Sequence, residues 1–257
     1  MTLRSRPSTY EHFLLSFPCE RVVQVTLNRP EKLNSITKET SSKIAEIWDL
    51  FDQDESLWVG IITGSGRAFC TGADLGEWNE MVRSGVVNDM SPPGLAGLPR
   101  RSGKKPIIAA VNGICMGGGF EMVANCDLVI ASSTATFALP ETKRGIVAVA
   151  GCPSIDAYYR PATTLYDWGL ITRLIDPGTN IAQAAAKLAG QICQNSPDAT
   201  IVGRQGVRLS WEAGSAEDAV TTLAKDWYPR LCAGENFAEG IRAFVEKRSP
   251  NWVNSKL

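Results

Sequence analysis

The sequence predicts an α/β fold in which strands and helices alternate first and a purely helical segment follows. Residues 22–27 are rich in β-branched side chains, which are typical of a strand. Residues 107–111 are continuously apolar, as expected of a strand buried on both faces. From about residue 178 onward the pattern is helical. This order indicates an α/β core with a helical C-terminal segment.

The other elements follow from the same patterns. Further strands are expected over residues 58–63 and 128–131, and helices over residues 38–53, 75–83 and 119–126. Residues 84–105 form a long loop rich in glycine and proline, and a loop of this length inside a domain is functional or mobile. We therefore expect a core over residues 1–177 and a helical segment over residues 178–257.

The bulk composition argues against several classes of protein. The 257 residues are enough to bury a sizeable core, and 44% of them are hydrophobic. A net charge of −1 favours neither nucleic acid nor an anionic membrane as the partner. No apolar run approaches the roughly 20 residues that span a bilayer, so we expect no membrane span. The polar N-terminus indicates no signal peptide.

Cysteine and histidine usage narrows the chemistry. The seven cysteines form no C-x-x-C pair, so free thiols in a reducing compartment are expected. His12 is the only histidine, which leaves no H-E-x-x-H zinc site and no histidine triad elsewhere. We expect no metal, and acid–base chemistry must fall to carboxylates, Lys, Tyr or Cys.

Three consecutive glycines, residues 117–119, stand immediately before an apolar helix. Glycine permits close approach, and the first N–H groups of a helix lack internal partners, so the segment can form an oxyanion hole. A tight strand-to-helix turn explains the same glycines equally well. Their spacing matches neither a dinucleotide fingerprint nor a P-loop.

Two glutamates in apolar surroundings are candidates for acid–base catalysis. Glu121 lies within an apolar stretch, and Glu141 follows Pro140 in another. Burial raises the pKa of a carboxyl group toward the range useful for proton transfer, and two such groups can serve as acid and base. For Glu121 taken alone, a position on a solvent-exposed helix face or a structural hydrogen bond is a slightly better explanation than catalysis. The spacing does not show that the two glutamates meet.

A second glycine turn, residues 69–74, follows the strand expected at 58–63. It could supply a second donor to an oxyanion hole. Alternatively, it is a loop in which Asp74 caps the next helix.

Together these segments closely resemble the crotonase (enoyl-CoA hydratase/isomerase) family. The matching stretches are residues 27–34, 66–75, 105–127, 137–145 and 239–252, and their order and spacing agree over about residues 13–150. The resemblance implies a crotonase-like spiral of ββα units whose C-terminal helices mediate trimers, often paired into hexamers. It also implies an acyl thioester of coenzyme A as the substrate and no further cofactor.

The resemblance also implies roles for individual residues. The backbone N–H groups of Ala73 and Gly118 would form the oxyanion hole. Both glutamates together are typical of the family's hydratases, which add water across the 2,3 double bond of an enoyl-CoA. Glu121 would activate the water that adds to C3, and Glu141 would deliver the proton to C2. The coenzyme A part would be bound by Lys32, Ala68, Phe69, Thr71, Gly72, Asp74 and Leu75.

Other activities remain open at this point. An isomerase, a decarboxylase or an acyl-CoA hydrolase of the same family is an alternative, as is a non-catalytic subunit that binds coenzyme A. The near-neutral charge argues against an RNA-binding relative. One basic cluster, formed by Arg100, Arg101, Lys104 and Lys105, is expected to be a solvated loop or, alternatively, to contact coenzyme A phosphates.

The sequence departs from the family pattern after Gly145. Roughly two dozen residues, comparable to one or two helices of average length, are absent before residues 166–171. In the family these residues close the acyl pocket and brace the position of Glu141, and their loss supports the non-catalytic alternative. Tyr158, Tyr159 and Arg160 have no counterpart and are expected to pack locally.

Ser255, Lys256 and Leu257 match the S-K-L tripeptide that is a peroxisomal address. We therefore expect a peroxisomal protein that is recognised by an import receptor. Both fatty-acid β-oxidation and specialised metabolite synthesis in a fungus suit a peroxisomal hydratase.

Overall fold

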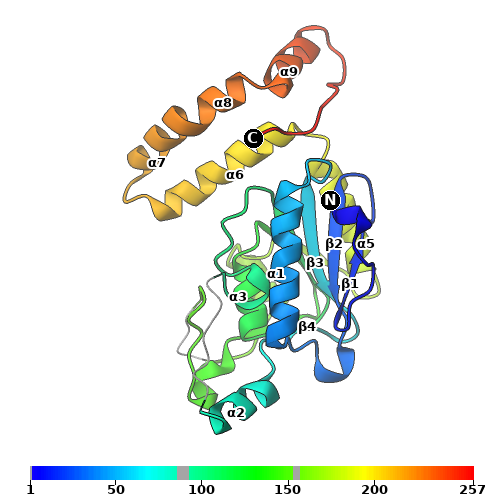
Figure 1. The fold of residues 1–257 in the computed structure, drawn as a ribbon, viewed down its shortest axis with the longest axis vertical. Helices are drawn as coiled ribbons and strands as arrows, with labels where there is room; N and C mark the ends of the chain where they lie inside the picture. The colour runs from blue at the N-terminus through cyan, green and yellow to red at the C-terminus, as the bar shows by residue number, and fades with distance from the viewer. Residues whose placement is uncertain (1, 86–92, 153–156) are drawn as a thin grey trace.

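The computed structural model describes residues 2–85, 93–152 and 157–257 and is built on two sheets (Figure 1). The larger sheet has the order β1-β2-β3-β5-β7-β10, and all its pairs are parallel except β1 with β2. Its strands are β1 Phe13–Ser16, β2 Val22–Leu27, β3 Val59–Gly64, β5 Ile107–Val111, β7 Leu128–Ser132 and β10 Arg173–Ile175.

A second sheet consists of four short strands. Its order is β4-β6-β8-β9, with parallel pairs up to β8 and an antiparallel last pair. The strands are β4 Ala68–Cys70, β6 Ile114–Met116, β8 Thr136–Ala138 and β9 Arg160–Pro161. Parallel strands end at the same edge of a sheet, so the turns after β4, β6 and β8 meet there.

The helices confirm most of the predicted boundaries. They are α1 Lys38–Gln53, α2 Leu75–Arg83, α3 Gly118–Ala124, α4 Ala162–Asp167, α5 Ile181–Ile192, α6 Pro197–Glu212, α7 Ala216–Thr222, α8 Tyr228–Cys232 and α9 Glu235–Val245. Helix α1 has the predicted bounds because Ile44, Ile47, Trp48 and Phe51 are all buried at helical spacing. Helix α2 begins at its predicted cap, since Asp74 accepts hydrogen bonds from the N–H groups of Gly76 and Glu77.

Two apolar cores lie on opposite faces of the large sheet. One core joins α1 to both sheets, as the burial of Trp48, Val25 and Phe137 shows. The other core packs α5 against the opposite face through Leu188, Ile108 and other side chains. Helix α5 therefore belongs to the core layer, although the sequence predicts it within the helical segment that starts at residue 178.

The helical segment that stands away from the core begins with α6. Helix α6 runs outward, and α7 to α9 return alongside it (Figure 1). Arg204 ties α6 to the core through an ion pair of 2.6 Å with Asp127. Large apolar side chains on these helices are exposed to solvent, and Trp211 and Phe244 are 86% and 85% exposed.

The prediction that the basic cluster is a solvated loop is partly wrong, because two of its four side chains are buried. Arg101 forms an ion pair of 2.6 Å with Asp52. Lys105 donates hydrogen bonds to the carbonyl groups of Phe51 and Asp54, at 2.8 and 2.6 Å. These carbonyls lie at the C-terminal end of α1, where backbone acceptors lack helical partners. Burial lowers the pKa of Lys105 to about 8.

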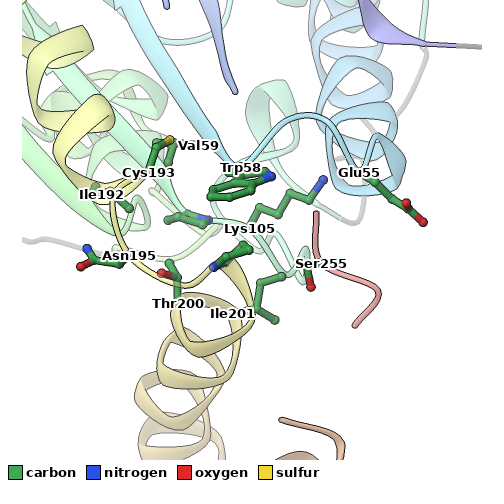
Figure 2. A pocket seen from close by; sticks show the side chains of 12 residues that line it. Glu55, Trp58, Val59, Lys105, Ile192, Cys193, Asn195, Thr200, Ile201 and Ser255 are labelled. Atoms are coloured by element: carbon green, nitrogen blue, oxygen red, sulfur yellow. The ribbon is translucent and has the colours of Figure 1, made fainter. Parts of the chain in front are cut away.

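The surroundings of Lys105 leave no room for a ligand. Figure 2 shows Lys105 beside Trp58 and Ser255 in a crevice near the start of α6. Its volume is about 10 Å³, which is no more than one water molecule occupies. We therefore assign Lys105 and Arg101 to the support of α1 rather than to binding of the substrate.

The predicted peroxisomal tripeptide lies against the rest of the chain. Ser255 is buried, its hydroxyl accepts a hydrogen bond from the N–H of Leu257, and Lys104 contacts the Leu257 carbonyl. The peroxisomal address stays a prediction. Among the described helices, none is long and apolar enough to cross a membrane.

Replacing Lys105 by Met is expected to destabilise the fold by about 1–3 kcal/mol, because the buried Phe51 carbonyl loses its Lys105 donor and the Asp54 carbonyl keeps only the N–H of Leu57. The free energy of unfolding from urea titration measures this change. Lys187→Met, at an exposed position of α5, is the matched control and should stay within about 0.5 kcal/mol of wild type. An equal stability of the two variants would contradict the supporting role.

Candidate active site

A pocket of about 740 Å³ opens where the strands of the small sheet end. The turns after β4, β6 and β8 supply Gly72, Gly118 and Glu141 to its wall. Helix α3 adds Glu121, so the two glutamates, 20 positions apart in the sequence, line one cavity. A cavity of this size is typical of a site for a small molecule.

Two backbone N–H groups are free to bind a ligand in this pocket. Gly118 is the first residue of α3, where an N–H has no intrahelical acceptor. The neighbours of Ala73 are bound to Ile36, since the N–H of Ile36 donates to Gly72 and the N–H of Asp74 donates to Ile36. Within the described part of the chain, the N–H groups of Ala73 and Gly118 have no hydrogen-bond partner. Two such donors can stabilise a negatively charged oxygen.

The two glycine turns touch, and this contact requires glycine. Gly72 has a φ of +92°, and a Cβ at this position would lie 2.9 Å from the Gly118 nitrogen. Gly117 has a φ of +57°, and its Cβ would lie 2.9 Å from Oε1 of Glu141. Side chains other than hydrogen would therefore block both the donors and a carboxylate.

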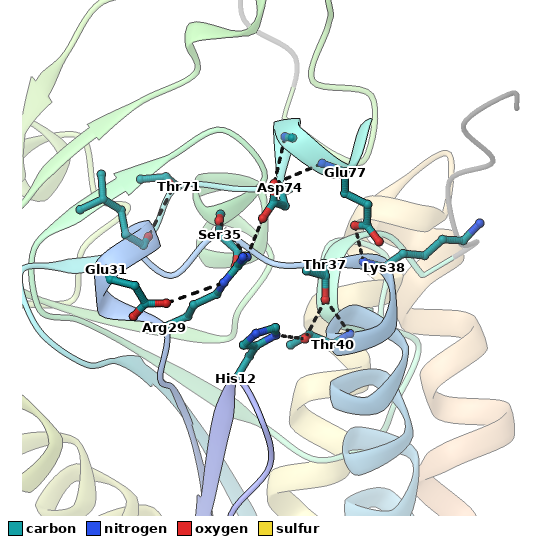
Figure 3. A network of polar contacts seen from close by, with 12 residues as sticks. His12, Arg29, Glu31, Ser35, Thr37, Lys38, Thr40, Thr71, Asp74 and Glu77 are labelled. Atoms are coloured by element: carbon teal, nitrogen blue, oxygen red, sulfur yellow. Dashed lines mark hydrogen bonds and ion pairs between the residues drawn. The ribbon is translucent and has the colours of Figure 1, made fainter. Parts of the chain in front are cut away.

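Arg29 holds the first turn in place from outside the pocket (Figure 3). Its guanidinium forms an ion pair of 2.5 Å with Asp74, next to Ala73, and lies 3.4 Å from the carbonyl and hydroxyl oxygens of Ser35. This hydrogen bond from Arg29 lowers the pKa of Asp74. Asp74 therefore serves as a helix cap and an anchor for the turn.

Glu121 is held as a hydrogen-bond acceptor. Its side chain is 5% exposed, and Oε1 accepts a hydrogen bond of 2.8 Å from the N–H of Ala150. The side chain of Asn125 donates to the backbone carbonyl of Glu121 at 2.8 Å and so fixes this end of α3. The bond from Ala150 fixes the orientation of the Glu121 carboxyl group in the pocket.

Glu141 has the opposite environment. It is 9% exposed, and within the described residues its buried Oε2 has no hydrogen-bond partner. Burial raises the pKa of Glu141 above its ordinary value, and the nearby charge of Glu121 raises it further. Two carboxyl groups with contrasting environments beside a pair of free N–H groups can move protons while an oxygen gains negative charge.

The predicted coenzyme A residues divide into two groups. Lys32, Thr71, Gly72 and Leu75 line the pocket. The side chains of Ala68 and Phe69 are buried in the core, and Asp74 is engaged by Arg29, so these three do not line it. Ala68, Phe69 and Asp74 therefore support the glycine turn at residues 69–74 instead of lining the pocket.

Residues after Glu141 form a wall of the pocket that the sequence did not predict. We call residues 145–150 the strap. Its Ala148 and Ala150 are buried, whereas Val147 and Val149 are exposed and line the pocket. This alternation, which is typical of an extended segment, was the available signal in the sequence.

The prediction that Tyr159 packs locally is wrong. Its side chain is 62% exposed and lines the same pocket as the glutamates. The described residues of 145–159, which leave out 153–156, contain no helix. Tyr158 is exposed as well, with a ring 5.6 Å from the Arg160 guanidinium carbon.

Within the described residues, no group of three His, Cys, Asp or Glu side chains could hold a metal ion. Cys152 is close enough to Glu121 and Glu141 for their charges to act on it. Burial raises its pKa, and the charges of Glu121 and Glu141 raise it further.

Known proteins resemble this chain along its whole length. The family model described as enoyl-CoA hydratase/isomerase matches residues 19–156. Mevalonyl-coenzyme A hydratases of Aspergillus fumigatus and Beauveria bassiana are 48% and 37% identical, with all of each chain covered. Carnitinyl-CoA dehydratase of Proteus mirabilis is 36% identical over 90% of this chain and 94% of its own.

Solved structures agree with the fold. An enoyl-CoA hydratase of Mycobacterium tuberculosis superposes with a TM-score of 0.85 at 29% identity, covering 96% of this chain and 100% of its own. The comparison with the Aspergillus fumigatus protein spans 272 aligned positions, 15 more than the 257 residues present here. The alignment therefore contains gaps in this chain that add up to about 15 positions.

Glu141→Gln is expected to raise the melting temperature at pH 7.5, because a buried carboxylate is replaced by a neutral group. Since the folded-state pKa is raised, the folded protein binds this proton more tightly than the unfolded chain. The cost of ionisation is therefore absent at low pH and appears as pH rises through the folded pKa. The gain should shrink as the pH falls toward 4, which thermal unfolding at several pH values would measure. A gain that does not depend on pH would contradict this account.

Proposed function

The chain belongs to the enoyl-CoA hydratase/isomerase family, as a hydratase of the crotonase type, and we propose that it interconverts mevalonyl-CoA and the corresponding 2-enoyl-CoA. The observation that carries the proposal is the position of Glu121 and Glu141 beside the free N–H groups of Ala73 and Gly118. The two fungal relatives named mevalonyl-coenzyme A hydratases support the choice of substrate. They also favour a specialised pathway over general fatty-acid oxidation.

The hydration direction assigns one task to each group. Glu121 takes a proton from water as its oxygen bonds to C3 of the enoyl thioester. The electron pair of the double bond moves to the thioester oxygen, which the N–H groups of Ala73 and Gly118 stabilise. Glu141 then delivers a proton to C2, and its raised pKa suits a group that carries this proton.

Dehydration runs through the same groups in reverse. Glu141 removes a proton from C2, the enolate forms in the oxyanion hole, and the hydroxyl at C3 leaves with a proton from Glu121. Because two close carboxyl groups share protons as a pair, one proton can pass between Glu121 and Glu141 from one turnover to the next. No cofactor besides the coenzyme A of the substrate enters these steps.

The coenzyme A part lies at the β4 side of the pocket in this proposal. Lys32 and Lys38 line this side and provide positive charge for phosphate groups. The exposed Trp211 and Phe244 on the C-terminal helices support a homo-oligomer, which would bury them.

Glu121→Gln and Glu141→Gln should each lower kcat by about 10²–10⁴-fold, because each removes a proton-transfer group. Loss of the ultraviolet absorbance of an enoyl thioester measures hydration of crotonyl-CoA and of the 2-enoyl form of mevalonyl-CoA. Activity of both variants near that of wild type would sink the assignment.

Gly72→Ala should lower kcat by about 10²–10³-fold, because its methyl group would crowd the Gly118 nitrogen. Gly85→Ala is the matched control. Gly85 also has a positive φ of +73°, but a Cβ there meets nothing within 4 Å. Both variants share the strain of a positive φ, so equal losses of activity would mean that strain rather than the blocked donor is responsible.

A further inference from the structure

Tyr159 has no role in the chemistry described above, although it lines the pocket that holds Glu121 and Glu141. Among the described residues, its hydroxyl has no hydrogen-bond partner. The ammonium nitrogen of Lys143 lies 6.0 Å from the centre of the Tyr159 ring. The phenol is therefore available to a ligand.

The register of the small sheet determines which way Tyr159 faces. Met116 pairs with Ala138, and Phe137 pairs with Arg160 in the antiparallel ladder. One residue further along this ladder, Tyr159 falls beside Ala138, in the same row as Met116. Side chains in one row of a sheet point to the same face. Met116 and Tyr159 both line the pocket, as this register requires.

The order of the strands gives the direction of the substrate. Along the sheet, β4 leads to Ala73, β6 leads to Gly118, β8 leads to Glu141, and β9 begins directly after Tyr159. A thioester oxygen bound by Ala73 and Gly118 thus places the reacting carbons toward Glu141. The rest of the acyl chain continues toward Tyr159, away from the coenzyme A side.

The distances suit a short acyl chain. Neighbouring strands lie about 4.8 Å apart, so the backbone of Tyr159 is about 10 Å from that of Met116, two strands away. The terminal hydroxyl of a five-carbon acyl group lies roughly 6 Å from the thioester carbon. The tyrosine ring spans much of the remaining distance and brings its hydroxyl toward this group.

The wall of the pocket near Tyr159 is mainly apolar. A polar contact at Tyr159 would therefore distinguish a hydroxylated acyl chain from one without a hydroxyl. Val147 and Val149 of the strap face the pocket, which suits the methyl branch at C3 of mevalonyl-CoA. Arg144 also lines the pocket, but its guanidinium donates to the Pro140 carbonyl at 3.4 Å.

We propose that the Tyr159 hydroxyl hydrogen-bonds to the terminal hydroxyl of a short branched acyl chain and thereby selects hydroxylated acyl-CoA thioesters. The inference rests on the proposed function, because it concerns the acyl end of the same site. A site built to bind a substrate hydroxyl discriminates strongly against the analogue that lacks it.

The test compares two substrates that differ by this hydroxyl, 5-hydroxy-3-methylpent-2-enoyl-CoA and 3-methylpent-2-enoyl-CoA. Hydration of each by wild type, Tyr159→Phe and Tyr158→Phe is followed by enoyl absorbance. Tyr159→Phe should reduce the preference for the hydroxylated substrate, as a ratio of kcat/KM values, about five- to ten-fold. Tyr158 is exposed and does not line the pocket, so Tyr158→Phe should keep the wild-type preference.

The outcomes separate this inference from the proposed function. If wild type hydrates the hydroxylated substrate and Tyr159→Phe keeps its preference, the role of Tyr159 is overturned while the proposed function stands. An equal loss on both substrates would also overturn it, because Tyr159 would then only shape the pocket. If wild type hydrates neither substrate, the proposed function fails and the inference falls with it.

Discussion

The contact between the glycine turns after β4 and β6 is the constraint on which the site depends. Gly72 and Gly118 approach so closely that a single added carbon would crowd an amide nitrogen. This approach places the N–H groups of Ala73 and Gly118 side by side and leaves both free. The parallel pairing of β4, β6 and β8 brings the turns to one edge, where Glu141 follows the third strand. The two free N–H groups and Glu141 are thus brought together by the small sheet.

The two glutamates lie in contrasting environments. Glu121 is held by a backbone N–H, whereas Glu141 keeps a buried oxygen without a partner in the described structure. A buried polar atom of this kind costs stability, and such costs concentrate where function requires them. Burial raises the pKa of Glu141 and so favours its protonated form, as a group that transfers a proton requires.

The strap braces both glutamates from one side of the pocket. Its Ala150 N–H holds Glu121, and the N–H of Ile146 donates to the backbone carbonyl of Glu141 at 3.2 Å. A few extended residues thus brace both glutamates without a helix in the described part of this segment. Val149 of the strap and Tyr159 are both exposed and line the same pocket.

The sequence by itself determined the local elements and which residues were candidates for acid–base catalysis. Apolar periodicity predicted both ends of α1, and the resemblance to the crotonase family singled out Glu121 and Glu141. Only the tertiary structure decided that these glutamates share a pocket, that Lys105 supports a helix end, and that Tyr159 lines the same pocket. Local patterns encode period and burial, because these depend on neighbours a few positions away. Proximity depends instead on strand order and on hydrogen bonds between distant segments, which no local pattern records.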